Sequence, residues 1–262
     1  MTETMSIMLK KQETNSSMTE SDTKYDVNKV KVGIVVTCRY NSNRLPGKIL
    51  MKIEEKEVLG YIHERLSHVT LAGDIIVATS IEQDDDIIVD FCKSHGIKYY
   101  RGHKDDVAQR ILECAIKHNF DYFVRICGDN VFTDFQLLDK MVNIAVTGNH
   151  NLVSNLKGRT FPAGISIEVL KTEFFRDIIL RYKTSDQKEH VTLYLYDHEL
   201  EIGPHYYLYN DICPEARSIK LALDDINDLS FITKLIKKMD KDHTEYLIKD
   251  IYELSKEIIE TS

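Results

Sequence analysis

Residues 30–48 read VKVGIVVTCRYNSNRLPGK, an apolar run followed directly by a loop rich in cations. β-Branched residues dominate from Val30 to Val36, which favours a buried β-strand. Pro46 and Gly47 then mark a sharp turn. This stretch predicts a strand over 30–37 that ends at a loop able to approach a ligand closely.

Similar short β-branched runs recur along the chain, separated by longer segments with helical periodicity. This alternation is typical of βαβ units and a largely parallel sheet, so it predicts an α/β fold. The predicted strands are 30–37, 75–79, 98–100, 122–126, 152–155, 165–170, 206–209 and 219–223. The predicted helices are 58–69, 85–95, 105–118, 135–146, 188–198, 226–239 and 245–259.

Composition limits the class of protein. Residues 1–29 are polar without an apolar period, which predicts a disordered N-terminal tail before one domain at 30–262. The formal net charge of −8 argues against a nucleic-acid partner, which requires a basic face. No apolar run approaches the roughly 20 residues that span a bilayer, and the five cysteines lack metal or redox spacing. We therefore expect a cytoplasmic protein without a membrane partner.

The loop after the first predicted strand carries three cations, Arg39, Arg44 and Lys48. Planar arginine forks and a point-charge lysine are the groups that bind oligophosphate oxygens. The glycine spacing of a Walker A loop or a dinucleotide motif is missing. The loop predicts a phosphate-binding site, and a solvated basic loop is the alternative.

Two aspartates follow predicted strands, Asp129 after 122–126 and Asp224 after 219–223. Ligands bind at the carboxyl ends of strands in open α/β sheets, so these carboxylates can converge on a hard cation such as Mg²⁺. The alternatives are a turn residue for Asp129 and a helix N-cap for Asp224. The run Asp84–Asp86 is a second candidate metal site, although its place before a predicted helix favours capping.

The string from Arg39 to Lys48, R-x-x-S-x-R-L-P-G-K, resembles the triphosphate loop of the cytidylyltransferases that activate acidic sugars. The spore-coat polysaccharide biosynthesis branch is the most similar, and the 3-deoxy-manno-octulosonate and acylneuraminate cytidylyltransferases are related. The resemblance continues in order through residues 77–80, 101–110, 125–129, 159–168, 189–192 and 223–229.

This resemblance implies a three-layer αβα nucleotidyltransferase fold. It also implies Mg²⁺-dependent transfer of CMP from CTP to an acidic or phosphorylated sugar-like acceptor in surface glycan biosynthesis. Catalytic roles are implied for Arg39, Arg44, Lys48 and Asp129, and metal binding for Asp129 and Asp224. The implied nucleotide-binding residues are Arg39, Ser42, Arg44, Gly47, Lys48, Ala78, Thr79, Ser80, Arg101, Gly102 and Asp106. The implied acceptor-binding residues are Arg159, Pro162, Gly164, Glu168, Glu189 and His190.

Several alternatives stay open. Ala163 and Ser166 stand where the resembled family carries arginine and aspartate, so the acceptor is undetermined. His190 either contacts the acceptor or satisfies a buried hydrogen bond. The cluster 205–209 predicts a strand, with a homodimer contact as the alternative. A metal-dependent glycosyltransferase that uses Asp84–Asp86 would need fewer cations, and a non-catalytic nucleotide-binding homologue would not need both aspartates.

Overall fold

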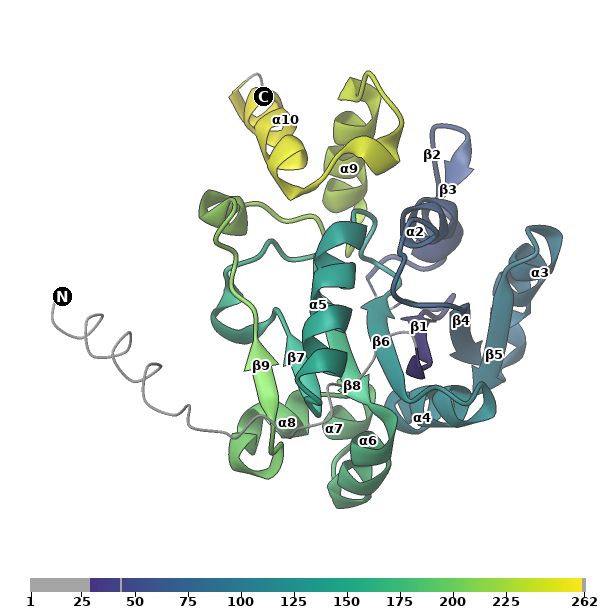
Figure 1. Ribbon diagram of the computed structural model, residues 1–262. Helices are drawn as coiled ribbons and strands as arrows, with labels where there is room; N and C mark the ends of the chain where they lie inside the picture. Colours follow the sequence, from purple (N-terminus) through teal and green to yellow (C-terminus); the bar gives the residue numbers. More distant parts are fainter. Residues whose placement is uncertain (1–28, 43, 261–262) are drawn as a thin grey trace, which may run out of the picture.

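The computed structural model describes residues 29–42 and 44–260, so the tail predicted for 1–29 lies, except for Lys29, outside the described residues. The described chain forms a seven-stranded mixed sheet in the order β5-β4-β1-β6-β8-β7-β9 (Figure 1). Its strands are β1 (Val32–Thr37), β4 (Ile75–Ser80), β5 (Lys98–Gly102), β6 (Tyr122–Cys127), β7 (Leu152–Ser154), β8 (Glu168–Lys171) and β9 (His205–Tyr207). A separate hairpin joins β2 (Lys52–Ile53) to β3 (Lys56–Glu57).

β1 occupies the centre of the sheet because its neighbours lie on both sides. It pairs in parallel with β4 and with β6, so that Val35 lies between Ile76 and Arg125. β5 extends the parallel half beyond β4, whereas β8 runs antiparallel to both β6 and β7. The chain thus leaves β1 toward β5 and returns to its other side at β6. This reversal of strand order is where open α/β sheets bind ligands.

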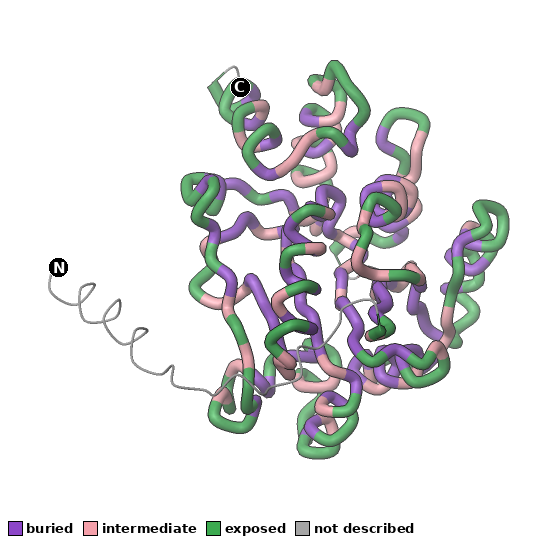
Figure 2. The backbone as a smooth tube through the Cα atoms, viewed as in Figure 1, coloured by how far each residue is buried: buried purple, intermediate pink, exposed green. Residues whose placement is uncertain are grey.

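Helices cover both faces of the sheet, which makes three layers (Figure 1). Side chains of β1 alternate between two cores, with Ile34 and Val36 in one and Val35 in the other. The first core includes α2 (Val58–Leu66), α3 (Asp86–Ser94), α5 (Phe135–Thr147), α9 (Ile226–Lys238) and α10 (Ile248–Glu260). The second includes α4 (Val107–Lys117), α6 (Thr172–Ile178) and α8 (Leu193–Asp197). Figure 2 shows the central strands buried between the exposed outer sides of the helices.

The prediction of an α/β fold is confirmed, and most predicted helices and strands are present with shifted ends. Helix α6 was not predicted. Across the described part of the chain, each helix is too short or too polar to cross a membrane.

The single helix predicted over 188–198 is wrong. The structure has α7 (Ser185–Glu189) and α8, separated at Val191, whose φ is 45°. A positive φ is rare for a β-branched residue and needs support from its surroundings. Val191 is fully buried, and its carbonyl oxygen accepts a hydrogen bond from Tyr182 Oη at 2.5 Å. Helical periodicity on both sides concealed this break from the sequence.

The strand predicted over 219–223 is also wrong. Among the described residues, this segment makes only isolated bridges, Asn130 with Ala222 and Ala163 with Lys220. Its alternating apolar residues are buried, as in a strand, but no continuous ladder forms. The segment still runs beside the end of β6, because Leu223 N donates to Asp129 O at 3.0 Å.

Candidate active site

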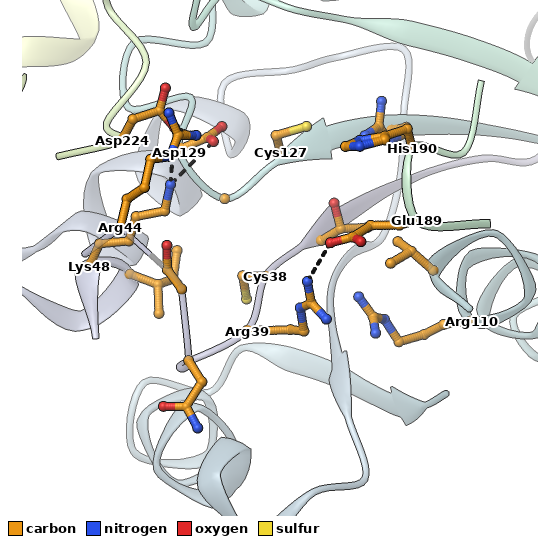
Figure 3. Close-up of a pocket in the computed structure, with 17 residues that line it drawn as sticks. Cys38, Arg39, Arg44, Lys48, Arg110, Cys127, Asp129, Glu189, His190 and Asp224 are labelled. Atoms are coloured by element: carbon orange, nitrogen blue, oxygen red, sulfur yellow. Dashed lines mark hydrogen bonds and ion pairs between the residues drawn. The ribbon is translucent and has the colours of Figure 1, made fainter. Parts of the chain in front are cut away.

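A cavity of about 310 Å³ lies at the carboxyl ends of β1 and β6 (Figure 3). It therefore occupies the point where strand order reverses. Its lining residues are Thr37, Cys38, Arg39, Asn41, Ser42, Arg44, Lys48, Ile49, Val107, Arg110, Arg125, Cys127, Gly128, Asp129, Glu189, His190 and Asp224.

A tight turn sets the loop after β1. Gly47 has a φ of 74°, a left-handed conformation that glycine adopts without cost. Its N–H donates to Tyr40 O at 2.7 Å, and a Cβ at this position would lie 3.1 Å from Tyr40 Oη. Lys48 follows as the first residue of a short 3₁₀ helix, Lys48–Leu50. The Pro46-Gly47 turn thus directs Lys48 into the cavity wall.

The ends of β1 and β6 approach each other closely at Gly128. A Cβ on this residue would lie 2.7 Å from Cys38 Cβ and 3.1 Å from Thr37 O. Only glycine therefore allows the turn after β6 to pass so near β1. This approach places Asp129 opposite the cation-rich loop.

Two aspartates meet around one lysine. Lys48 Nζ lies 3.4 Å from Asp129 Oδ2 and 3.6 Å from Asp224 Oδ1, and it donates to Leu223 O at 2.6 Å. Arg44 Nη2 contacts the same Asp224 oxygen at 2.7 Å. The structure thus brings two of the three cations predicted for triphosphate binding, Arg44 and Lys48, to both aspartates predicted for metal binding.

The two carboxylates around Lys48 fit a magnesium site whose other ligands come from a bound molecule and water. Asp129 and Asp224 offer oxygen ligands already spaced around one positive charge, and Mg²⁺ prefers oxygen ligands supplied by one or two carboxylates plus substrate phosphates and water. Within residues 29–42 and 44–260, no group of three or more His, Cys, Asp or Glu side chains could hold a metal alone. The remaining ligands would therefore be phosphate oxygens and water.

Arg39 lies apart from the other two cations of the loop. Its Nη2 contacts Glu189 Oε1 at 2.8 Å, and its Nη1 lies 3.7 Å from Asp105 Oδ1. Figure 3 shows Arg39, Arg110 and Glu189 on one side of the cavity and Arg44 on the other. The cavity therefore has two charged ends instead of the single cationic cluster that the loop sequence suggests.

Glu189 and His190 come from the end of α7, where the break at Val191 stops the helix. Both residues line the cavity, and their contact with an acceptor stays a prediction. Had the helix continued, these neighbouring positions would have faced different directions around its axis. The strained turn at Val191 thus helps to place them at the cavity.

The thiol of Cys127 lines the cavity but is a poor nucleophile. Burial, together with the charge of Asp129, raises its pKa to about 11, although Arg125 opposes the shift. A thiol with this pKa is protonated near neutral pH, and the thiolate is the reactive form. Covalent catalysis by this cysteine is therefore disfavoured.

Four of the residues predicted to bind the nucleotide lie outside the cavity lining. Ala78, Thr79 and Ser80 are buried in β4, and Arg101 Nε donates to Ser80 O at 2.9 Å. Arg101 also pairs with Asp86 at 2.6 Å, which fixes the turn after β4. Their role in nucleotide binding stays a prediction.

Gly102 and Asp106 border the same region without lining the cavity. Asp106 caps α4 by accepting from Gln109 N at 2.9 Å, and it pairs with Lys188 of α7 at 3.3 Å. Asp106 thus links α4 to α7. Its direct contact with nucleotide also stays a prediction.

The aspartate run 84–86 supports the loop after β1 and does not line the cavity. Asp85 is buried and accepts from Tyr40 N at 2.7 Å and from Ser80 N at 3.0 Å. Asp84 contacts Asn41 Nδ2 at 2.5 Å. The expected capping is wrong for Asp85, since it occupies the N-cap position of α3 without a side-chain cap bond. Its carboxylate instead holds the cation-rich loop.

The predicted acceptor segment 159–168 is divided by the fold. Arg159 and Pro162 line a second, very small cavity of about 10 Å³, together with Ser166. Gly164 lines neither cavity. Glu168 is buried behind Arg125 of the main cavity, and the two contact each other at 2.5 Å. The acceptor roles of this segment stay predictions.

Two arginines that line the cavity, Arg110 and Arg125, have no role predicted from the sequence. Arg125 lies within the predicted strand 122–126, two residues before Cys127, so the period of two places both on one face. A charged residue in an otherwise apolar strand was the available signal. Arg110 lay within the helical period of α4 and gave no comparable signal.

The protein has the three-layer fold of a nucleotidyltransferase. The cation-rich loop and the two aspartates lie where its strand order reverses. Residues 33–257 match the family model described as "Cytidylyltransferase", so the chain belongs to the cytidylyltransferase family. The resemblance and the fold class predicted from the sequence are thereby confirmed.

The chain is also similar to individual members of this family. The spore coat polysaccharide biosynthesis protein SpsF of Bacillus subtilis is 28% identical over 213 residues, which cover 78% of this chain and 85% of that protein. A 3-deoxy-manno-octulosonate cytidylyltransferase of a Psychrobacter species is 32% identical over 123 residues, 45% of this chain and 43% of that protein. The solved structure of a cytidylyltransferase from Leptospira borgpetersenii superposes with a TM-score of 0.82 at 27% identity, covering 88% and 96% of the two chains.

Proposed function

We propose that the protein transfers CMP from CTP to an acidic or phosphorylated sugar-like acceptor and releases pyrophosphate. The observation that carries this proposal is the convergence of Arg44, Lys48, Asp129 and Asp224 at one end of the cavity. Two cations and two carboxylates joined by ion pairs of 2.7–3.6 Å suit a triphosphate with its cation. Family membership supports CTP as the nucleotide.

In this reaction an acceptor oxygen attacks the α-phosphorus of CTP. The bond from that phosphorus to the bridging oxygen of the β-phosphate breaks, and pyrophosphate leaves. If the attacking group is a hydroxyl, its proton is released. Since little covalent work falls to the protein, positioning and charge stabilisation supply most of the catalysis.

The two ends of the cavity bind different parts of the nucleotide. Arg44 and Lys48 bind the β- and γ-phosphates and stabilise the negative charge that develops on pyrophosphate. Asp129 and Asp224 would hold Mg²⁺, which when bound would offset the charge of the phosphate oxygens. Arg39 lies at the other end of the cavity, where it pairs with Glu189. Once Arg39 separates from Glu189, it stabilises the charge of the α-phosphate.

The similarity to SpsF supports a role in polysaccharide biosynthesis. A sugar activated with CMP is a donor for a glycosyltransferase, so this protein would act one step before transfer to a surface glycan. The Asp84–Asp86 reading of a glycosyltransferase has less support, because Asp85 and Asp84 are already engaged by Tyr40 and Asn41.

A pyrophosphate-release screen tests this function. CTP, UTP, GTP and ATP are each combined with Mg²⁺ and a panel of acidic sugars, sugar phosphates and neutral sugars. We expect release with CTP and at least one anionic acceptor. Release of a nucleoside diphosphate from a sugar nucleotide would favour a glycosyltransferase, and absence of turnover despite CTP binding would favour a non-catalytic homologue. Inactivity of Asp224→Asn with the same pair would show that the turnover belongs to this site.

A further inference from the structure

Arg125 stands at the boundary between the cavity and the antiparallel half of the sheet. It lines the cavity from β6, and its strand neighbour on β8 is Glu168. Residues directly opposite each other in an antiparallel pair project to the same face. The pair therefore lies on the cavity face of the sheet, with Arg125 toward the cavity and Glu168 behind it.

Glu168 holds one side of the Arg125 guanidinium. Arg125 Nη1 donates to Glu168 Oε2 at 2.5 Å, and Tyr196 Oη donates to Glu168 Oε1 at 2.7 Å. Tyr196 Oη lies 2.6 Å from Ser154 Oγ, which extends the network to β7. The Glu168 side chain is only 1% exposed. Because both carboxylate oxygens are engaged in a buried network, the plane of the guanidinium is set before any ligand arrives.

Arg125 retains donors that the described protein residues do not use. Its Nε is buried without a partner. Its Nη2 also makes no hydrogen bond within the described part of the chain, and the side chain, which lines the cavity, is 15% exposed. A guanidinium stays protonated and offers five N–H donors, and an unmade bond at a desolvated donor is costly. Nη2 is therefore available to an oxygen of a bound molecule.

The position of Arg125 favours the acceptor over the nucleotide. The cation-rich loop follows β1, whereas Arg125 lies on β6 beside β8, on the other side from β4 and β5. Arg44 and Lys48 already gather at Asp129 and Asp224. A molecule that contacts Arg125 would therefore approach the α-phosphate from the side of the sheet that holds β8. The strands β4 and β5 lie on the opposite side of β1.

We propose that Arg125 binds an anionic oxygen of the acceptor through Nη2 and thereby determines acceptor specificity, with Glu168 as its positioning residue. The inference rests on the proposed function, since it assigns the acceptor half of the same cavity. Carboxylates and phosphates both match the planar donors of a guanidinium. The test below uses one carboxylate probe and one phosphate probe, so it distinguishes these two kinds of acceptor.

Calorimetry on the full chain tests the assignment. The protein is saturated with Mg²⁺ and a CTP analogue whose α,β-bridging oxygen is a methylene group, which prevents transfer. The probes are 3-deoxy-manno-octulosonate for a carboxylate and ribose 5-phosphate for a phosphate, with ribose as the neutral control. Arg125→Lys keeps the charge opposite Glu168 but loses the planar fork. We expect Arg125→Lys to lower the affinity for an anionic probe at least about tenfold and to change the nucleotide affinity less than about twofold.

Two further variants separate binding from folding. The double variant Arg125→Gln with Glu168→Gln removes both charges, so it leaves no unpaired buried charge and should show the same loss of probe affinity. Glu168→Gln alone should lower the probe affinity less than the Arg125 variants do, because Arg125 remains. Arg65→Lys is the matched control, since Arg65 is buried outside the cavity and bonds to Thr133 O and Tyr246 O. It should lower the melting temperature without changing either affinity.

The outcomes are distinct. Unchanged probe affinity in both Arg125 variants would overturn the inference, as would an equal loss of nucleotide affinity, which would place Arg125 on the nucleotide. Binding of neither anionic probe by the nucleotide-loaded wild type would also overturn it. Failure of the wild type to bind the nucleotide analogue would instead refute the proposed function on which the inference rests.

Discussion

Arg44 Nη2 contacts Asp224 Oδ1 at 2.7 Å across a sequence separation of 180 residues. In the proposed function these two residues have different ligands, a phosphate oxygen for Arg44 and Mg²⁺ for Asp224. In the free protein they pair with each other, and Asp224 also lies 3.1 Å from Lys220 and 3.6 Å from Lys48, which in turn lies 3.4 Å from Asp129. Nucleotide and metal must therefore replace protein ion pairs with a new set of contacts.

The first prediction is that Mg²⁺ and CTP bind cooperatively. Mg²⁺ alone must separate Asp224 from Arg44 and leave the arginine unpaired, whereas a triphosphate gives Arg44 a new partner. We expect the affinity for Mg²⁺ to rise at least tenfold when CTP is present, and by linkage CTP should gain equally from Mg²⁺. Calorimetric titrations in both orders measure the two factors.

The Arg44→Ala variant provides the control for cooperativity. Without Arg44 the Asp224 carboxylate is freer, so Mg²⁺ alone should bind more tightly than it binds to the wild type. Tight binding of Mg²⁺ to the wild type without nucleotide would contradict the exchange of partners.

The second prediction concerns the two aspartates. Asp129→Asn and Asp224→Asn each replace a charged oxygen ligand by an amide, so each should lower turnover by at least about two orders of magnitude. Because the residues serve one site, the double variant should cost much less than the product of the single losses. Steady-state pyrophosphate release measures these effects.

A matched control for these substitutions is Asp139→Asn. Asp139 lies outside the cavity, where it accepts from Thr70 N and Leu71 N, so its loss should affect stability and leave turnover near the wild-type value. A nearly silent Asp224→Asn together with an inactive Asp85→Asn would move the metal to the 84–86 run.

The third prediction tests the cation-rich loop. Arg44→Ala and Lys48→Ala should each lose roughly a hundredfold in turnover, comparable to the removal of one transition-state donor. Lys52→Ala is the control, because Lys52 is 58% exposed and pairs only with Glu57 at 3.7 Å among its described neighbours. Wild-type turnover in both loop variants would be incompatible with a triphosphate at this loop.

The fourth prediction is a loss of stability on acidification through His243. Its Nε2 lies 2.8 Å from Glu64 Oε2, and its Nδ1 is buried without a partner. Burial lowers the pKa of His243 below 6.5, although the bond to Glu64 opposes the shift. Burial would raise the pKa of Glu64, but its bonds to His243 and Lys56 lower it overall.

Both shifts have the same consequence, since each folded-state pKa lies below its unfolded value. The unfolded chain binds more protons, so the stability is complete above about pH 6.5 and falls as the pH drops below it. For His243 the limiting slope is about 1.4 kcal/mol per pH unit. Melting temperatures between pH 7.5 and pH 5 should fall less in His243→Gln, whose amide can still donate to Glu64. An equal fall in both proteins would place the acid sensitivity elsewhere.

Part of this site could be predicted from local patterns. The β-branched run 30–37 and the Pro46-Gly47 turn are local features, and the structure places β1 and the loop where they indicate. Asp129 lies two residues after β6, a strand that its local run of apolar residues indicates. Such predictions succeed because the side chains that determine the conformation are neighbours in the sequence.

Other parts depend on contacts that no local pattern records. Residues 219–223 have the alternation of a strand, yet within the described residues they form only isolated bridges, and the contact of Leu223 with Asp129 helps to place Asp224 at the cavity. The burial of Val191 and its bond to Tyr182 stabilise a φ that the residue disfavours alone. Arg39 separates from Arg44 because Glu189, 150 residues away, offers it a carboxylate. Hydrophobic periodicity reports which side chains become buried, but hydrogen-bond and ion-pair partners are chosen by the packing of distant segments, so only the tertiary structure decides them.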